Sequence, residues 1–128
     1  MDCPRCAVEL SPITHAESTV HRCAECGGLW SDVADLNRIL LHGGLPALSA
    51  TGGFVNPEEM TGLCPACQVD LVVVQGGEKK NVAYDTCESC GGIWVDGEED
   101  EPAETIEWKD AEKQFVDFFR RFAKKNKK

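Results

Sequence analysis

The sequence CPRC at residues 3–6, followed by CAECGGLWSD at residues 23–32, decides the fold of this chain. The same pattern returns as CPAC at residues 64–67 and CESCGGIWVD at residues 87–96. Each of the eight cysteines in the 128-residue chain belongs to one of these four pairs. The chain therefore carries one cysteine signature twice, and the two copies predict two sites of four thiolates each.

The spacing of these cysteines is typical of metal ligands. A Cys-x-x-Cys turn lets two thiolates bind one ion, and two such turns supply a tetrahedron of sulfurs that Zn²⁺ accepts readily. The two turns are separated by 16 residues in the first copy and 19 in the second, within the range of such zinc sites. We predict two Zn²⁺ ions per chain, each bound within its own repeat. The predicted ligands are Cys3, Cys6, Cys23 and Cys26 for one ion and Cys64, Cys67, Cys87 and Cys90 for the other.

Other uses of the cysteines remain open. Four thiolates also suit iron in a rubredoxin-like site, although the Gly-Gly-x-Trp after the second pair of each copy favours zinc. No βαβ pattern surrounds either copy, which argues against a thioredoxin-like redox pair. A site with four protein ligands has no open position for substrate, and the sequence contains no Ser-His-Asp grouping or phosphate loop. We therefore predict that the protein is not an enzyme and has no catalytic residues.

The cysteine content also bears on location. No stretch approaches the roughly 18 apolar residues of a membrane span. The first predicted ligand is the third residue, so we expect no signal peptide. Paired cysteines that bind metal are typical of a reducing compartment. We expect a cytoplasmic protein without membrane contact.

The net charge of −9 restricts the partners. Eight thiolates and two Zn²⁺ ions would bring it to about −13, which disfavours nucleic acid and favours a protein partner. The charge is uneven, because residues 96–112 hold nine acids and one lysine, whereas residues 120–128 hold six bases and no acid. We interpret these as a solvated acidic segment and a basic tail. A tail that contacts nucleic acid is the alternative.

The apolar pattern divides the chain into four parts. We predict a first ribbon with a short helix over residues 1–43, a linker over 44–61, a second ribbon over 62–101 and a C-terminal helix over 102–128. Short β-prone runs at 7–10 and 18–21, and at 71–74 and 81–84, predict one hairpin per repeat. After Trp30, the apolar residues Val33, Leu36, Ile39 and Leu40 fall on one helical face.

Single residues next to the cysteines receive structural roles. We expect the glycine pairs at 27–28 and 91–92 to let the backbone curl past each second cysteine pair. Trp30 and Trp94 are each expected to cover the site of their own repeat. Asp32 and Asp96 are interpreted as helix N-caps. The three histidines at positions 15, 21 and 42 are assigned to the surface or to packing.

The C-terminal helix carries a long apolar stripe. Its members are Trp108, Ala111, Phe115, Phe118 and Phe122, with Phe119 beside them. So many aromatic residues on one face need cover. We expect the stripe to pack on the second ribbon or to bridge both ribbons. Self-association, or docking into a partner's groove, is the alternative.

The complete motif, Cys-Pro-x-Cys, a β-rich spacer and Cys-x-x-Cys-Gly-Gly-x-Trp-x-Asp-x-x-Asp/Glu-Leu, resembles the bacterial TFIIB-type zinc-ribbon family, here in two tandem copies. Residues 3–36 follow the pattern to its end in Asp35-Leu36, whereas Asp100 replaces the final leucine in the second copy. The resemblance implies zinc binding by the eight cysteines. A transcription-related role is implied by analogy of fold alone.

Together these observations predict a small metal-bound α+β fold of two tandem zinc ribbons. The expected function is that of a non-catalytic adaptor or regulator that binds a macromolecular partner, with protein favoured. A nucleic-acid-binding regulator that uses the ribbons and the basic tail is the second hypothesis, and a rubredoxin-like electron carrier is the third.

Overall fold

A computed structural model describes residues 1–15, 17–48, 54–76, 82–96 and 108–122. The strands and helices are β1 (Ser11–His15), β2 (Ser18–Arg22), β3 (Leu29–Ser31), α1 (Val33–His42), β4 (Phe54–Leu63), β5 (Asp70–Gly76), β6 (Val82–Thr86), β7 (Ile93–Val95) and α2 (Trp108–Phe122). None of the described helices is long and apolar enough to cross a membrane. The predicted α+β class with two ribbons, a short helix and a C-terminal helix is confirmed.

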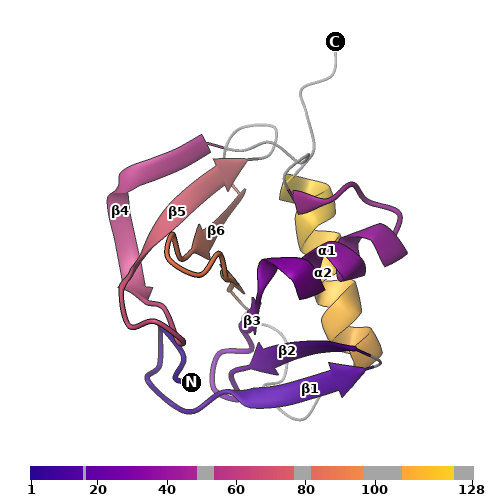
Figure 1. The fold of residues 1–128 in the computed structure, drawn as a ribbon, viewed down its shortest axis with the longest axis horizontal. Coiled ribbons are helices and arrows are strands. Elements are labelled where there is room, and N and C mark those ends of the chain that lie inside the picture. The colour runs from indigo at the N-terminus through magenta and orange to yellow at the C-terminus, as the bar shows by residue number, and fades with distance from the viewer. Residues whose placement is uncertain (16, 49–53, 77–81, 97–107, 123–128) are drawn as a thin grey trace.

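The two repeats share one antiparallel sheet, with the strand order β1-β2-β3-β7-β6-β5-β4. They meet where β3 pairs with β7, and there Trp30 lies directly opposite Trp94. Leu29 pairs with Val95 and Ser31 with Ile93, so the motif of one repeat runs against the same motif of the other. The repeats are therefore related by an approximate two-fold axis that passes near the tryptophan pair. In Figure 1 the strands lie to the left and below, and both helices lie to the right.

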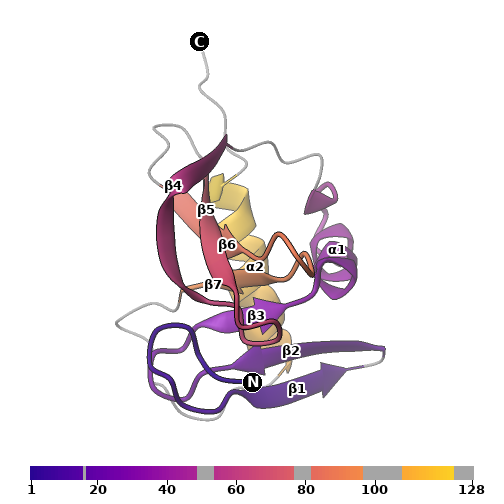
Figure 2. The same cartoon turned by 60° about the vertical axis from the view of Figure 1, so that its left-hand side comes forward.

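Each face of the sheet has its own core. Because side chains alternate along a strand, Leu29 of β3 and Ile93 and Val95 of β7 share one face while the two tryptophans occupy the other. Helices α1 and α2 cover the first face, as the turned view of Figure 2 also shows. The second face carries Trp30 and Trp94 among the cysteines. The cysteines thus lie on the face opposite to the helical core, and Nε2 of Gln114 in α2 donates to the carbonyl of Gly27, directly after Cys26, at 3.1 Å.

The helix after the first repeat forms as predicted. The side chain of Asp32 accepts a hydrogen bond from the amide of Asp35, which makes Asp32 the N-cap, and Gly43 ends the helix. Asp35 does not complete a capping box among the contacts of the described residues. Its carboxylate accepts from the amide of Thr19 in β2 at 3.2 Å and pairs with Arg38. The first turn of α1 is thereby tied to the first hairpin.

Two predictions about the strands differ from the structure. The first strand of the first hairpin is 11–15 instead of 7–10, because Ala7 adopts a left-handed conformation and residues 8–10 wrap the first cysteine turn. The stretch 44–61 is not wholly a linker, since β4 begins at Phe54 and pairs with β5. An edge strand tolerates a proline at position 57 and the irregular register between Asn56 and Met60, two features that suggested a loop.

The apolar stripe of α2 is buried in its own chain. Phe115 and Phe119 are fully buried, and Phe122 contacts Tyr84 of β6 with ring centroids 5.0 Å apart. The same cluster contains Leu36 and Ile39 of α1 and Val74 of β5, so α2 bridges both repeats. This is the internal packing expected for the stripe. The predicted residues 102–107 and 123–128 of this helix and tail lie outside the described residues.

Candidate metal centres

Four cysteine turns of one design build the two sites. In each turn the first cysteine's carbonyl accepts a hydrogen bond from the amide of the residue just after the second cysteine, at 2.7–3.0 Å. That residue has positive φ in every turn, and it is Ala7, Gly27, Gln68 or Gly91. The predicted curl at Gly27 and Gly91 is present, with φ of 77° and 78°. This left-handed step turns the chain back and leaves both sulfurs of a pair on one side.

The hairpin of each repeat brings its two cysteine turns together, although they are far apart in the sequence. Cys3, Cys6, Cys23 and Cys26 form one group, which we name site 1, and Cys64, Cys67, Cys87 and Cys90 form the other, site 2. In each group all four Sγ atoms lie within 4.8 Å of one another. The structure thus brings together the four cysteines of each repeat, with no crossing between repeats.

The sulfur positions fit a metal ion of the size of Zn²⁺. A tetrahedron with metal–sulfur bonds of about 2.3 Å has sulfur–sulfur edges of about 3.8 Å. The Sγ atoms of Cys3 and Cys26 are 3.8 Å apart, and those of Cys64 and Cys90 are 3.7 Å apart. These distances are far longer than a disulfide bond, and all eight cysteines are free thiols.

Backbone amides point at the sulfurs and tune their ionisation. The amides of Arg5 and Cys6 lie 3.2 and 3.3 Å from Sγ of Cys3, and those of Ala66 and Cys67 make the same bonds to Cys64. Burial raises the pKa of Cys87, but amide and thiol hydrogen bonds outweigh it and lower that pKa to about 7. Burial and neighbouring thiols raise the pKa of Cys64 to about 12. Because Zn²⁺ binds cysteines as thiolates, binding of the ion by thiols that are still protonated releases their protons.

The two tryptophans are exchanged between the repeats, which corrects the sequence prediction. A methyl group built on Gly28 would lie 2.1 Å from Cζ2 of Trp94, and one on Gly92 would lie 2.1 Å from Cζ2 of Trp30. Each indole therefore packs on the second cysteine turn of the other repeat. The exchange follows from the antiparallel pairing of β3 with β7. Each of these strands runs from its own cysteine turn toward the cysteine turn of the other repeat, so its tryptophan lies beside that second turn.

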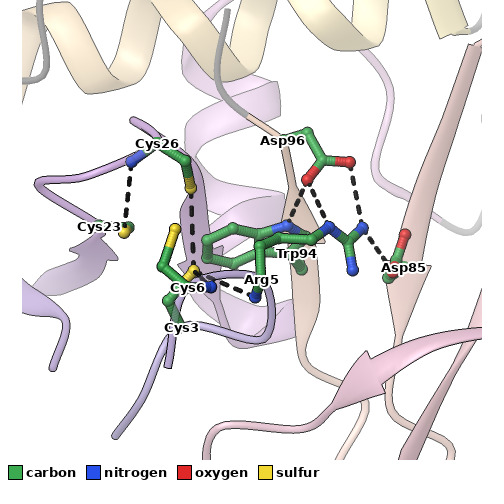
Figure 3. A network of polar contacts seen from close by, with 8 residues as sticks. All are labelled: Cys3, Arg5, Cys6, Cys23, Cys26, Asp85, Trp94 and Asp96. Atoms are coloured by element: carbon green, nitrogen blue, oxygen red, sulfur yellow. Dashed lines mark hydrogen bonds and ion pairs between the residues drawn. The ribbon is translucent and has the colours of Figure 1, made fainter. Parts of the chain in front are cut away.

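Asp96, which the sequence suggested as a helix N-cap, binds Trp94 and Arg5, and the residues that would follow it in such a helix, 97–107, lie outside the described residues. Its Oδ1 accepts hydrogen bonds from Nε1 of Trp94 and from Nε of Arg5, each at 2.8 Å (Figure 3). Arg5 further donates through Nη2 to Asp85 at 2.8 Å. Burial alone would lower the pKa of Arg5, but the two carboxylates raise it, so the guanidinium stays charged.

Arg5 and Asp85 were not recognised in the sequence. Arg5 occupies a variable position between two cysteines, where the second copy has Ala66. Asp85 lies in the apolar strand β6 and is 3% exposed, and an acid at such a position is a signal for a cationic partner. The histidines stay outside both sites. His15 stacks on Trp108 and His42 pairs with Glu112, while burial lowers the pKa of His21.

Comparison with known families places both sites within one type of domain. The profile of the family described as "Transcription factor zinc-finger", the TFIIB-type zinc ribbons, matches residues 2–42 and 63–101. The two matches confirm the resemblance to two tandem copies and leave out most of β4 and all of α2. No curated protein and no solved structure matches the chain significantly. The family binds zinc, and the two four-cysteine groups fit two zinc ions.

Proposed function

Because the chain belongs to the transcription factor zinc-finger family, we propose that it is a non-catalytic zinc-binding adaptor or regulator that binds a protein partner. The eight cysteines of sites 1 and 2 are its zinc ligands, four for each ion. A transcription-related process is the setting that the family supports. Paired cysteines that bind metal are typical of a reducing compartment, and we assign the protein to the cytoplasm.

The observation that carries this proposal is the closed form of both sites. Each site groups four sulfurs within 4.8 Å of one another, and one pair in each has the edge length of a zinc tetrahedron, so an ion bound by all four would have no position left for a substrate or an activated water. Within the described part of the chain, these two are the clusters of metal-ligand type. Zinc in such sites stabilises a fold and presents its surface.

A cleft beside the helices supports a basic protein partner. It has a volume of about 320 Å³ and lies between α1, α2 and the first hairpin. Trp108, Ile39 and Glu112 line it, and Glu112 is 20% exposed. The charge of Arg38 at the same cleft is balanced by Asp35. Glu112 pairs with His42 and the indole of Trp108 stacks on His15 in the free chain, so a lysine or arginine of the partner would compete with His42 for Glu112 and lay its stem along the open part of the indole.

The test begins with the full zinc-loaded chain as bait in a nuclease-treated native extract. A captured protein is purified and titrated against the wild type, Glu112→Gln and the control Asp117→Asn, which removes the same charge elsewhere on α2. We expect Glu112→Gln to weaken binding about fivefold, which corresponds to about 1 kcal/mol, and Asp117→Asn to leave it unchanged.

Different outcomes would redirect the proposal. If a partner were captured from an untreated extract but not from the nuclease-treated one, and if binding to nucleic acid depended steeply on salt, the nucleic-acid-binding regulator would be favoured. A visible absorption spectrum of the protein purified from its native source would reveal iron and favour the electron carrier, since zinc is colourless. Equal weakening by both variants would remove the cleft from the contact surface.

A further inference from the structure

Site 1 is held by residues of the second repeat at both of its cysteine turns. Trp94 packs on Gly28 in the second turn, and Asp96 binds Arg5 in the first turn. Nε1 of Trp94 also donates to Asp96 at 2.8 Å, so the two contacts form one connected unit (Figure 3). A three-residue stretch of the second repeat, 94–96, thereby clamps both halves of site 1.

Arg5 is the link between this clamp and the metal ligands. Its amide lies 3.2 Å from Sγ of Cys3, and its guanidinium makes bonds of 2.8 and 3.1 Å to the two carboxylate oxygens of Asp96. The bond from Arg5 to the buried Asp85 adds a second anchor. Two-point contact between a planar guanidinium and a carboxylate fixes geometry as well as charge. The first cysteine turn cannot move outward without breaking these contacts.

Among the described residues, site 2 has no counterpart of the clamp formed by Arg5 and Asp96. Ala66 stands where site 1 has Arg5, and Asp32, the counterpart of Asp96, is occupied as the N-cap of α1. Trp30 still packs on Gly92, so one of the two contacts remains. Cys90 is exposed, whereas its counterpart Cys26 is only partly exposed. Site 2 is therefore both less restrained and more accessible to a competing ligand.

We propose that the two zinc sites are unequal, with site 1 retaining its ion and site 2 serving as an exchangeable zinc site open to thiol or chelating ligands. Arg5 is the positioning residue that creates the difference. Exchange transfers Zn²⁺ without a change of oxidation state, and the released thiolates take up protons from water. Residues that orient metal ligands typically change metal affinity 10- to 100-fold when they are replaced. This inference goes beyond partner binding and depends only on both groups being loaded.

The test measures zinc release from the full chain with two bound Zn²⁺ ions, using an excess of a chromophoric chelator. Pulse alkylation followed by mass spectrometry of the cysteine peptides identifies which site opens in each phase. For the wild type we expect two phases, with the cysteines of site 2 labelled first and those of site 1 at least tenfold more slowly. We expect Arg5→Ala to accelerate the site 1 phase about tenfold or more and to leave the site 2 phase unchanged.

Two further variants separate this role from general destabilisation. Arg5→Lys keeps the charge without the two-point geometry, and we expect it to give a site 1 rate between those of the wild type and Arg5→Ala. Arg38→Ala removes an ion pair of the first repeat that lies outside the sites, and it should change neither phase. Equal rates at both sites in the wild type, earlier labelling of site 1, or the same acceleration of both phases by Arg5→Ala would overturn the proposal.

Discussion

The final aspartate of the motif makes different contacts in the two repeats. Asp32 follows β3 and caps α1, whereas Asp96 follows β7 and binds Arg5 and Trp94. Both residues close the segment Cys-x-x-Cys-Gly-Gly-x-Trp-x-Asp. The sequence beyond the motif decides the outcome, because Asp32 is followed directly by the helix 33–42. The repeated motif thus determines the metal ligands, while the residues that flank it determine whether its final aspartate caps a helix or binds the other repeat.

The comparison also shows that the repeats form one folding unit. Each tryptophan packs on the other repeat, β3 pairs with β7, and α2 lies against both halves. A four-cysteine unit of about 40 residues has too little core to fold alone, and here each unit supplies part of the core of its counterpart. We therefore expect damage at one site to be detected in the other repeat.

The largest effect should come from zinc removal. Structural zinc contributes about 10–16 kcal/mol of binding free energy in small domains, so complete chelation should unfold the chain and abolish its near-UV tryptophan signal. Because the indoles are exchanged, Cys23→Ser in site 1 should change the fluorescence of Trp94 first, and Cys87→Ser in site 2 that of Trp30. Trp108→Phe combined with either Trp30→Phe or Trp94→Phe leaves one tryptophan and separates the two signals. A near-UV spectrum that survives full removal of zinc would refute this dependence.

The next largest effect is expected at α2, a helix that has no counterpart of equal length in the first repeat. Phe115 is fully buried between α2 and the sheet, and Phe115→Asp should cost about 5 kcal/mol or more, because it loses a large apolar contact and buries a carboxylate. Thermal melting and sedimentation are measured together, with Lys113→Asp on the exposed face of the same helix as the control. A variant with an unchanged melting temperature that loses a dimer would favour self-association through this face.

A smaller effect comes from the glycines beneath the exchanged tryptophans. Gly28→Ala places a methyl group in the ring of Trp94, and overpacking of this kind costs up to about 3 kcal/mol. Trp94→Leu should partly rescue Gly28→Ala, with a coupling of about 1 kcal/mol or more in a double-mutant cycle. The mirrored cycle of Gly92→Ala and Trp30→Leu should give a similar value. Additive free energies in both cycles would contradict the exchange.

Local patterns in the sequence predicted local structure well. The cysteine spacing identified both groups, and the apolar periodicity after Trp30 identified α1 with its cap. The pairing of β3 with β7 could not be predicted, because three-residue strands carry no signal of their partner. The exchange of tryptophans and the link from Arg5 to Asp96 both follow from that pairing. These contacts through the β3–β7 pairing were therefore beyond the reach of motif analysis, whereas the apolar periodicity of α2 did indicate a helix that could bridge both repeats.

The smallest effect compares the two aspartates directly. Asp32→Ala removes the N-cap of α1, and the loss of such a cap costs about 1 kcal/mol. It should lower the melting temperature slightly and increase amide exchange in the first turn of α1, without changing zinc release from site 2. Asp96→Ala has no contact with α1 to lose, and it should leave exchange in that helix unchanged while accelerating zinc release from site 1. Hydrogen exchange and the chelator assay on both variants measure this crossed pattern. If the two substitutions had the same effect in both measurements, the two aspartates would have the same role. The claim that Asp32 caps α1 while Asp96 restrains site 1 would then be wrong.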